Sequence, residues 1–226
     1  MFKCPNSSVL FRIFAGTVVN AARVSFSKES EYIYDTTWAS TEKDLCLADK
    51  KLIKYLAKHD HFTPFTHCTM TFREEVPIFV ARQRFKHTIG FSYNEESRRY
   101  IDSDPTFYHP DVWRKKAENV KQGSSEEGIA SQGLTKEKYN HFLLKAKEMY
   151  DDLLKSDVAP EQARMCLPQS MYTSYYVTGS LSAFARAYKL RIDNHAQKEI
   201  QDLAKMWDSI CSSIYPISWK ELTIGN

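Results

Sequence analysis

Strand-like segments are scarce in this chain, and that scarcity limits the folds open to it. Residues 68–76 and 171–179 are rich in Thr, aromatic and β-branched residues, which predicts two strands. Residues 9–19 have a similar apolar character and predict a third. With so few strands, any sheet must be small and must be covered by other elements.

Helical patterns fill much of the remaining sequence. An apolar stripe from Tyr139 to Leu153, which includes Phe142 and Met149, predicts one long helix. A second helical pattern spans roughly residues 180–213 and is broken near Asp193. We therefore expect an α+β fold, with a small antiparallel or mixed sheet flanked by long helices.

The chain shows neither internal repeats nor a linker that would divide two cores. Its 226 residues are enough to bury a sizeable core. We therefore expect a single domain over residues 1–226. The Gly- and Ser-rich run 122–133 is the most loop-like part of the sequence, and we expect a mobile loop over residues 119–134.

Composition excludes several classes of function. The net charge of +3 is too small to indicate a nucleic-acid-binding surface. No apolar run reaches the length of a membrane span, and residues 1–10 lack the pattern of a secretory signal. We therefore expect a cytoplasmic protein that binds neither nucleic acid nor membrane. The cysteines form no CxxC pair, so we expect no zinc knuckle. His59, His61 and His67 are an alternative metal site, but only Asp60 and Cys68 could join them as ligands, so we expect no metal.

The densest set of polar side chains lies between residues 82 and 100, RQRFKHTIGFSYNEESRRY. Arginine and lysine side chains together with hydroxyl groups suit a phosphate. Amide and carboxylate side chains suit the edge of a base, where donors and acceptors must both be matched. This mixture indicates a small anionic ligand that carries a heterocycle.

Local structure would place these groups on a helix and the segment after it. Residues 78–87 predict a helix with Gln83, Lys86 and His87 on one face, and residues 88–100 predict an ordered loop. The alternative is a solvated, salt-bridged surface loop. Interleaved aromatic residues favour a packed segment with directed polar groups; they are Phe85, Phe91 and Tyr93.

This stretch resembles the signature of flavin-dependent thymidylate synthases. That signature reads Arg-His-Arg, two variable residues, Ser, one variable residue, Asn-Glu, one variable residue, Ser, one variable residue, Arg. Residues 92–100, SYNEESRRY, match its second half. Lys86-His87-Thr88 stands for Arg-His-Arg if one extra residue is allowed near Gly90, whereas without that gap His87-Thr88-Ile89 takes this place. We prefer the gap, because the preceding segment PIFVARQ then also matches the family.

Further segments resemble the same family in the same order along the chain. They are residues 21–26 (AARVSF), 59–67 (HDHFTPFTH), 163–168 (ARMCLP) and 190–197 (LRIDNHAQ). The resemblance covers most of residues 20–210. It implies the family's α+β fold in a single catalytic domain, and a homotetramer whose active sites are shared between subunits.

The resemblance implies a dUMP site built from the signature region and two further arginines. Arg191 matches the residue that polarises the uracil ring, which makes it the implied catalytic residue; from the residues alone, a salt bridge to Asp193 or to a neighbouring helix is the alternative. The implied dUMP-binding residues are Gln83, Arg84, Phe85, Lys86, Glu95, Glu96, Ser97, Arg98, Arg99, Arg164 and Arg191.

The resemblance also implies an FAD site. Its residues would be Ser25, Thr63, Lys86, His87, Thr88, Glu95, Ser180, Leu181, Ser182 and Arg186. His61 matches a histidine on the folate or nicotinamide side of the flavin. Thr88 and Ser182 stand where the family often has arginines, and Arg186 partly restores that charge.

The implied reaction is the reductive methylation of dUMP to dTMP. Methylenetetrahydrofolate would donate the carbon, and FAD reduced by NADPH would donate the hydride. Two alternatives stay open on the sequence: a flavin-dependent pyrimidine nucleotide hydroxymethylase of the same fold, and a non-catalytic nucleotide-binding protein.

Overall fold

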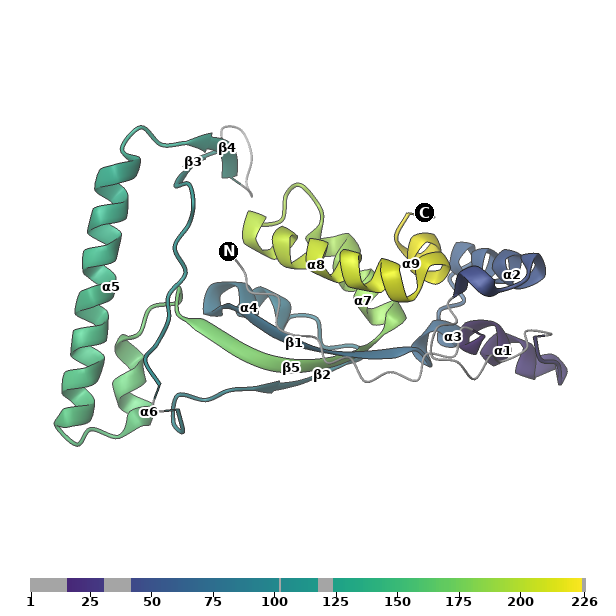
Figure 1. The fold of residues 1–226 in the computed structure, drawn as a ribbon, viewed down its shortest axis with the longest axis horizontal. Helices are drawn as coiled ribbons and strands as arrows, with labels where there is room; N and C mark the ends of the chain where they lie inside the picture. The colour runs from purple at the N-terminus through teal and green to yellow at the C-terminus, as the bar shows by residue number, and fades with distance from the viewer. Residues whose placement is uncertain (1–15, 31–41, 102, 118–123, 225–226) are drawn as a thin grey trace. The chain divides into compact units, whose positions relative to one another are not determined.

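The computed structural model describes residues 16–30, 42–101, 103–117 and 124–224 (Figure 1). Contacts divide these residues into two compact units. The first unit comprises residues 73–86 and 94–176, and the second comprises the described residues of 6–72, 87–93 and 177–226. The expectation of a single domain stays a prediction.

Three strands form the main sheet, in the order β1-β5-β2. They are β1 (Thr69–Pro77), β2 (Phe91–Glu95) and β5 (Tyr172–Ser180). The backbone N–H of Glu96 donates to Ser174 in the first unit, and that of Ser180 donates to Gly90 in the second. Positions therefore rise along one strand as they fall along its neighbour, so β2 and β5 are antiparallel. The small antiparallel sheet with long helices confirms the predicted α+β fold.

The helices of the second unit surround an aromatic core. Its helices are α1 (Thr17–Arg23), α2 (Leu47–Lys58), α3 (Thr63–Thr66), α7 (Leu181–Arg191), α8 (Lys198–Ile214) and α9 (Pro216–Thr223), with the short 3₁₀ helices η1 (Val24–Phe26) and η2 (Glu42–Asp44). Helices α7, α8 and α9 pack against one another, and α9 also packs on α2 (Figure 1). Phe184, Trp207 and Trp219 are almost fully buried among them.

The first unit contains the longest described helix, α5 (Gln132–Lys155). Its other elements are α4 (Ile78–Arg84), α6 (Pro160–Ala163), the 3₁₀ helix η3 (Arg164–Cys166), β3 (Arg114–Lys116) and β4 (Ser124–Gly128). Helix α6 packs against α5 (Figure 1), and β3 pairs with β4 in antiparallel fashion. Among the helices in the described ranges, none is long and apolar enough to cross a membrane.

Most element predictions are confirmed, and the exceptions have local causes. Strands 68–76 and 171–179 are present as β1 and β5, and the helical pattern 180–213 is broken between α7 and α8. The strand predicted for residues 9–19 is wrong where it can be compared, because Thr17–Val19 begin α1; residues 9–15 lie outside the described residues.

The segment predicted as helix 78–87 and loop 88–100 is also different. Helix α4 ends at Arg84, so Lys86 and His87 lie beyond it and do not share a helical face with Gln83. Residues 91–95 are strand β2 rather than loop. In the predicted mobile loop 119–134, the described part contains β4, the start of α5 and residues 129–131 between them.

Candidate functional site

In the second unit, a tight turn joins α4 to β2 and packs on α7. Gly90 at its end has φ +79°, and a Cβ built there would lie 2.9 Å from the Cβ of Ala183 on α7. The N–H of Ser180 donates to the carbonyl of Gly90 over 3.3 Å. Arg186 Nη2 donates to the carbonyl of Ile89 over 2.5 Å. A glycine is required here, because an L side chain would be strained and would collide with the helix.

The C-terminal residue of α7 reaches the same turn. Arg191 Nε lies 2.8 Å from His87 Nε2, and the histidine is only 8% exposed. Tyr93 Oη donates to the carbonyl of His87 over 2.7 Å. The implied catalytic arginine and an implied flavin residue are therefore in direct contact, 104 positions apart in sequence.

The N-terminus of α7 carries three of the implied FAD residues. Ser180 caps the helix by accepting a hydrogen bond from the N–H of Ala183 over 3.2 Å, and its hydroxyl lies 3.1 Å from that of Ser182. Leu181 is fully buried, so its side chain belongs to the core and any flavin contact there must come from its backbone. Hydroxyl groups at the positive end of a helix dipole suit a phosphate group.

The other implied flavin residues of the second unit lie on elements that adjoin one another. Ser25 is in η1, which packs with α1, and Thr63 begins α3, which packs with both α1 and α7. Both side chains are exposed, as is that of Thr88 in the turn. His61 is exposed just after α2, with its ring centroid 6.1 Å from that of Tyr55.

In the first unit, the carboxylates of the signature region face β5. Glu95 Oε1 accepts a hydrogen bond from Thr173 Oγ1 over 2.7 Å. The N–H of Glu96 donates to the carbonyl of Ser174 over 2.9 Å. Partial burial raises the pKa of the Glu96 carboxyl, and hydrogen bonding with Ser174 together with the positive charge of Arg98 opposes that rise. Strand β5 thus holds Glu95 and Glu96 in place just before Ser97.

Ser97 organises a turn that presents two arginines. Its Oγ accepts hydrogen bonds from both the N–H and the Nε–H of Arg99, each over 3.4 Å. The side chain of Arg98 is 9% exposed, and its Nη1 donates to the carbonyl of Ser103. Among the groups that the structure describes, Arg98 Nε has no hydrogen-bond partner. Both arginines line a cavity of about 260 Å³ that also includes Tyr150.

Arg84 is used inside the first unit rather than at a surface. Its guanidinium is fully buried, with Nε 3.1 Å from Glu74 Oε2, and Tyr175 Oη donates to the same oxygen over 2.6 Å. The ring of Phe85 packs edge-on against that of Tyr175, with centroids 4.8 Å apart. The dUMP contact expected of Arg84 stays a prediction; within the first unit its guanidinium is paired with the carboxylate of Glu74.

The remaining implied site residues of the first unit are Gln83, Lys86 and Arg164, and none of their side chains is buried. Gln83 Nε2 lies 3.5 Å from the carbonyl of Phe79, and Lys86 is exposed after the end of α4. Arg164 is exposed in η3, where its Nε donates to the carbonyl of Glu161 over 3.4 Å. These side chains can still reach a ligand, since none of them is buried.

The implied sites thus divide between the units. The first unit brings together Glu95, Glu96, Ser97, Arg98 and Arg99 along one short segment. The second brings His87, Thr88, Ser180, Ser182, Arg186 and Arg191 onto α7 and the turn beside it. Convergence of both sets on one nucleotide stays a prediction.

Sequence reasoning missed the residues that hold these groups in place. Glu74, Gly90 and Tyr93 belong to none of the implied ligand sets, yet each holds an implied site residue or the segment that carries one. The sequence marked Tyr93 only as an aromatic residue within a polar stretch. Glu74 sits at an inward position of an alternating strand, which is the signal that could have identified its buried charge.

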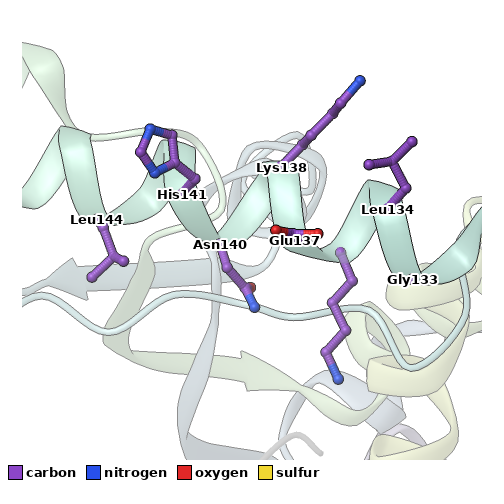
Figure 2. Close-up of a pocket in the computed structure, with 8 residues that line it drawn as sticks. Gly133, Leu134, Glu137, Lys138, Asn140, His141 and Leu144 are labelled. Carbon is purple, nitrogen blue, oxygen red and sulfur yellow. The ribbon is translucent and has the colours of Figure 1, made fainter.

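A separate hollow runs along the exposed side of α5. Figure 2 shows its lining residues, which include Leu134, Asn140, His141 and Leu144, and all of them come from this one helix. None of the implied substrate or flavin residues lies there.

Comparison with known proteins gives a consistent result. The family model described as "Thymidylate synthase complementing protein" matches residues 14–217. A protein of Thermosipho africanus named flavin-dependent thymidylate synthase is 40% identical over 189 residues, which are 82% of this chain and 76% of that protein. A protein of the same name from Thermotoga neapolitana is 36% identical, over 88% of this chain and 83% of its own length.

A solved structure shares the fold. The UMP/dUMP methylase PolB from Streptomyces cacaoi, bound with 5-Br dUMP, superposes with a TM-score of 0.76 at 28% identity. The superposition covers 96% of this chain and 93% of that one.

Proposed function

Because this chain belongs to the thymidylate synthase complementing protein family, we propose that it is a flavin-dependent thymidylate synthase that methylates dUMP to dTMP. The single observation that most supports this function is the contact of Arg191 with the turn that follows α4. It brings the residue implied to polarise uracil next to residues implied to hold the flavin. Methylenetetrahydrofolate is the proposed carbon donor, and NADPH the proposed reductant.

The chemistry of the second unit fits FAD. Ser180 and Ser182 place hydroxyl groups at the start of α7, and Arg186 adds a guanidinium beside the turn. Hydroxyl and guanidinium donors suit the pyrophosphate of a dinucleotide. When bound and reduced, the flavin supplies the hydride that completes the methyl group. The proposed FAD residues are those already named, with Leu181 acting through its backbone.

The proposed dUMP site uses the segment that follows β2. Arg99, held by Ser97, would pair with the phosphate. Arg98, whose Nε has no hydrogen-bond partner among the described groups, would add positive charge next to it. Glu95 and Glu96 offer acceptors for the base or the ribose. Arg191 would donate to the uracil ring and stabilise negative charge on it, since a guanidinium stays cationic and donates only.

The protein's own part is therefore binding, orientation and electrostatics, while the cofactors carry the chemistry. His61 is proposed to lie on the folate or nicotinamide side of the flavin. A homotetramer with shared active sites is proposed as well. Exposed apolar side chains on α5 would suit burial between subunits; Phe142 is 52% exposed and Met149 is 53% exposed.

An absorbance experiment tests this function. Purified protein with added FAD should bind the flavin saturably, lose its yellow colour with NADPH under anaerobic conditions, and change its reoxidation kinetics when dUMP is added. UMP serves as the matched control nucleotide. Failure of the protein to bind FAD would instead favour the alternative that it is a non-catalytic nucleotide-binding protein.

A further inference from the structure

We propose that His87 is a positioning residue: its imidazole fixes the guanidinium of Arg191 in the orientation that polarises the pyrimidine ring. This inference rests on the proposed function of Arg191. The contact joins Arg191 Nε to His87 Nε2 over 2.8 Å. Both residues belong to the second unit, so the contact lies within one compact body.

The contact defines the protonation of the histidine. Arginine carries only donors and stays charged, so Nε2 of His87 must be the acceptor. The ring proton is then on Nδ1, and the imidazole is neutral. A protonated ring would place two cations 2.8 Å apart at a site where the histidine is 8% exposed. The pair therefore works only with a neutral imidazole.

The surroundings of His87 make it a fixed support. Tyr93 Oη holds its carbonyl over 2.7 Å, and Gly90 presses the turn against α7. Arg186, one helical turn and a half before Arg191, holds the carbonyl of Ile89 from the same helix. The turn is thus attached to α7 through several independent contacts. The burial of His87 leaves its ring little freedom to move.

The consequence for Arg191 is loss of side-chain freedom before substrate arrives. A long arginine side chain loses rotamer freedom when its Nε is held by a fixed acceptor. With Nε committed to His87, contacts to a ligand are left to the Nη groups, whose direction the imidazole sets. Pre-orientation of this kind contributes strongly to rate, and a displacement of about 1 Å can cost on the order of 10²-fold.

Three variants separate positioning from other roles of His87. His87→Phe keeps a ring but removes the acceptor, whereas His87→Gln keeps an oxygen that can accept from Arg191 Nε. Arg191→Ala removes the partner. His141→Asn, on exposed α5, controls for loss of a histidine elsewhere. All are measured at saturating FAD, with FAD affinity determined separately by flavin fluorescence.

Turnover gives the first readout. We expect His87→Phe to lower kcat by on the order of 10²-fold with a smaller change in the KM for dUMP. His87→Gln should recover most of this loss. In the Arg191→Ala background, His87→Phe should cost nothing further, because a residue that acts through Arg191 has no effect without it.

Two readouts do not depend on turnover. The base of bound 5-bromo-dUMP should show the spectrum of its N3 anion in the wild type and in His87→Gln, and this signal should weaken in His87→Phe. Nitrogen NMR of isotope-labelled histidine should show His87 as the neutral ring with its proton on Nδ1. This last measurement needs only the folded wild-type protein.

Each contrary result overturns the inference. One such result is NMR evidence for an imidazolium or an Nε2–H tautomer at His87. Another is an equal loss of kcat in His87→Phe and His87→Gln. A third is additive losses of kcat when His87→Phe is combined with Arg191→Ala. Equal losses accompanied by weaker FAD binding would make His87 a flavin contact only. If the wild type binds 5-bromo-dUMP as its anion in the predicted variant-dependent way but makes no dTMP, the proposed function fails while the positioning role stands.

Discussion

Arg84 and Glu74 form a fully buried ion pair, with the guanidinium Nε 3.1 Å from the carboxylate. Their side chains are 0% and 3% exposed, and Tyr175 donates a further hydrogen bond to the carboxylate. The pair is thus part of the interior of the first unit. Its charges stabilise each other in a place that water does not reach.

Loss of Arg84 should therefore destabilise the protein. Arg84→Met leaves Glu74 buried without its counter-charge and should lower the free energy of unfolding by about 3–5 kcal/mol. Urea denaturation measures this change. The matched double variant Arg84→Met/Glu74→Gln should regain much of the loss. A fully stable single variant with weakened dUMP binding would contradict this role and favour Arg84 as a ligand-binding side chain.

Gly90 should tolerate no side chain. Gly90→Ala forces a left-handed conformation on a residue with a Cβ and pushes that Cβ to 2.9 Å from Ala183. Left-handed strain alone costs about 1–3 kcal/mol. We expect lower stability and weaker FAD binding, because the turn separates from α7. Gly133→Ala is the control, since a Cβ at Gly133 meets nothing within 4 Å; equal effects at the two sites would refute this explanation.

Glu42 should anchor α9. Its Oε2 accepts from the backbone N–H groups of Ile217 over 2.9 Å and Ser218 over 2.8 Å, and its Oε1 accepts from the Ser218 hydroxyl. Glu42→Ala leaves these donors unsatisfied and should cost about 1–3 kcal/mol of stability. Thermal unfolding measures the loss. No change in the melting temperature would contradict the proposed anchor.

Glu42→Gln isolates the charge. Burial raises the pKa of Glu42 in the folded state, against the opposing effect of its Ser218 and Ile217 hydrogen bonds. A carboxyl whose folded pKa is raised favours the folded state at low pH, and this contribution is lost as pH rises through that pKa. The stability of the wild type relative to Glu42→Gln should therefore fall from acidic to neutral pH. A stability advantage of the wild type over Glu42→Gln that grows from acidic to neutral pH would contradict this prediction.

Arg99 should contribute to dUMP affinity. Arg99→Ala removes a charge-assisted contact to the phosphate and should weaken binding by about 1.5–3 kcal/mol. Isothermal titration calorimetry with dUMP measures this loss. Lys116→Ala, on exposed β3, controls for the removal of one positive charge. Equal affinities for the wild type and Arg99→Ala would remove Arg99 from the proposed site.

The sequence predicted elements well where burial follows a regular period. Within the predicted helical pattern 180–213, five apolar residues of α8 recur at helical spacing and are buried: Ile200, Leu203, Ala204, Trp207 and Cys211. Helix α5 shows the limit of the same argument. Leu143, Ala146 and Tyr150 are buried, but Phe142 and Met149 from the same apolar stripe are exposed, since only part of the stripe packs within the first unit.

The sequence predicts the residues of the candidate site but not the contacts between them. The resemblance to the family indicated both His87 and Arg191, yet no local pattern relates two positions so far apart. The burial of Arg84 and Leu181 depends on partners from other elements, which composition and periodicity do not identify. The chemistry of the groups was therefore predictable from the sequence, whereas the fold decides which of them bind other residues of the protein.

The identity of the nucleotide product tests the account most directly. The wild-type protein is incubated with dUMP, methylenetetrahydrofolate, FAD and NADPH, and the product is analysed by mass spectrometry. We predict dTMP, heavier than dUMP by one methylene unit, with formation dependent on both FAD and the folate. A hydroxymethylated nucleotide, or unchanged dUMP with fully loaded flavin, would contradict the proposed synthase.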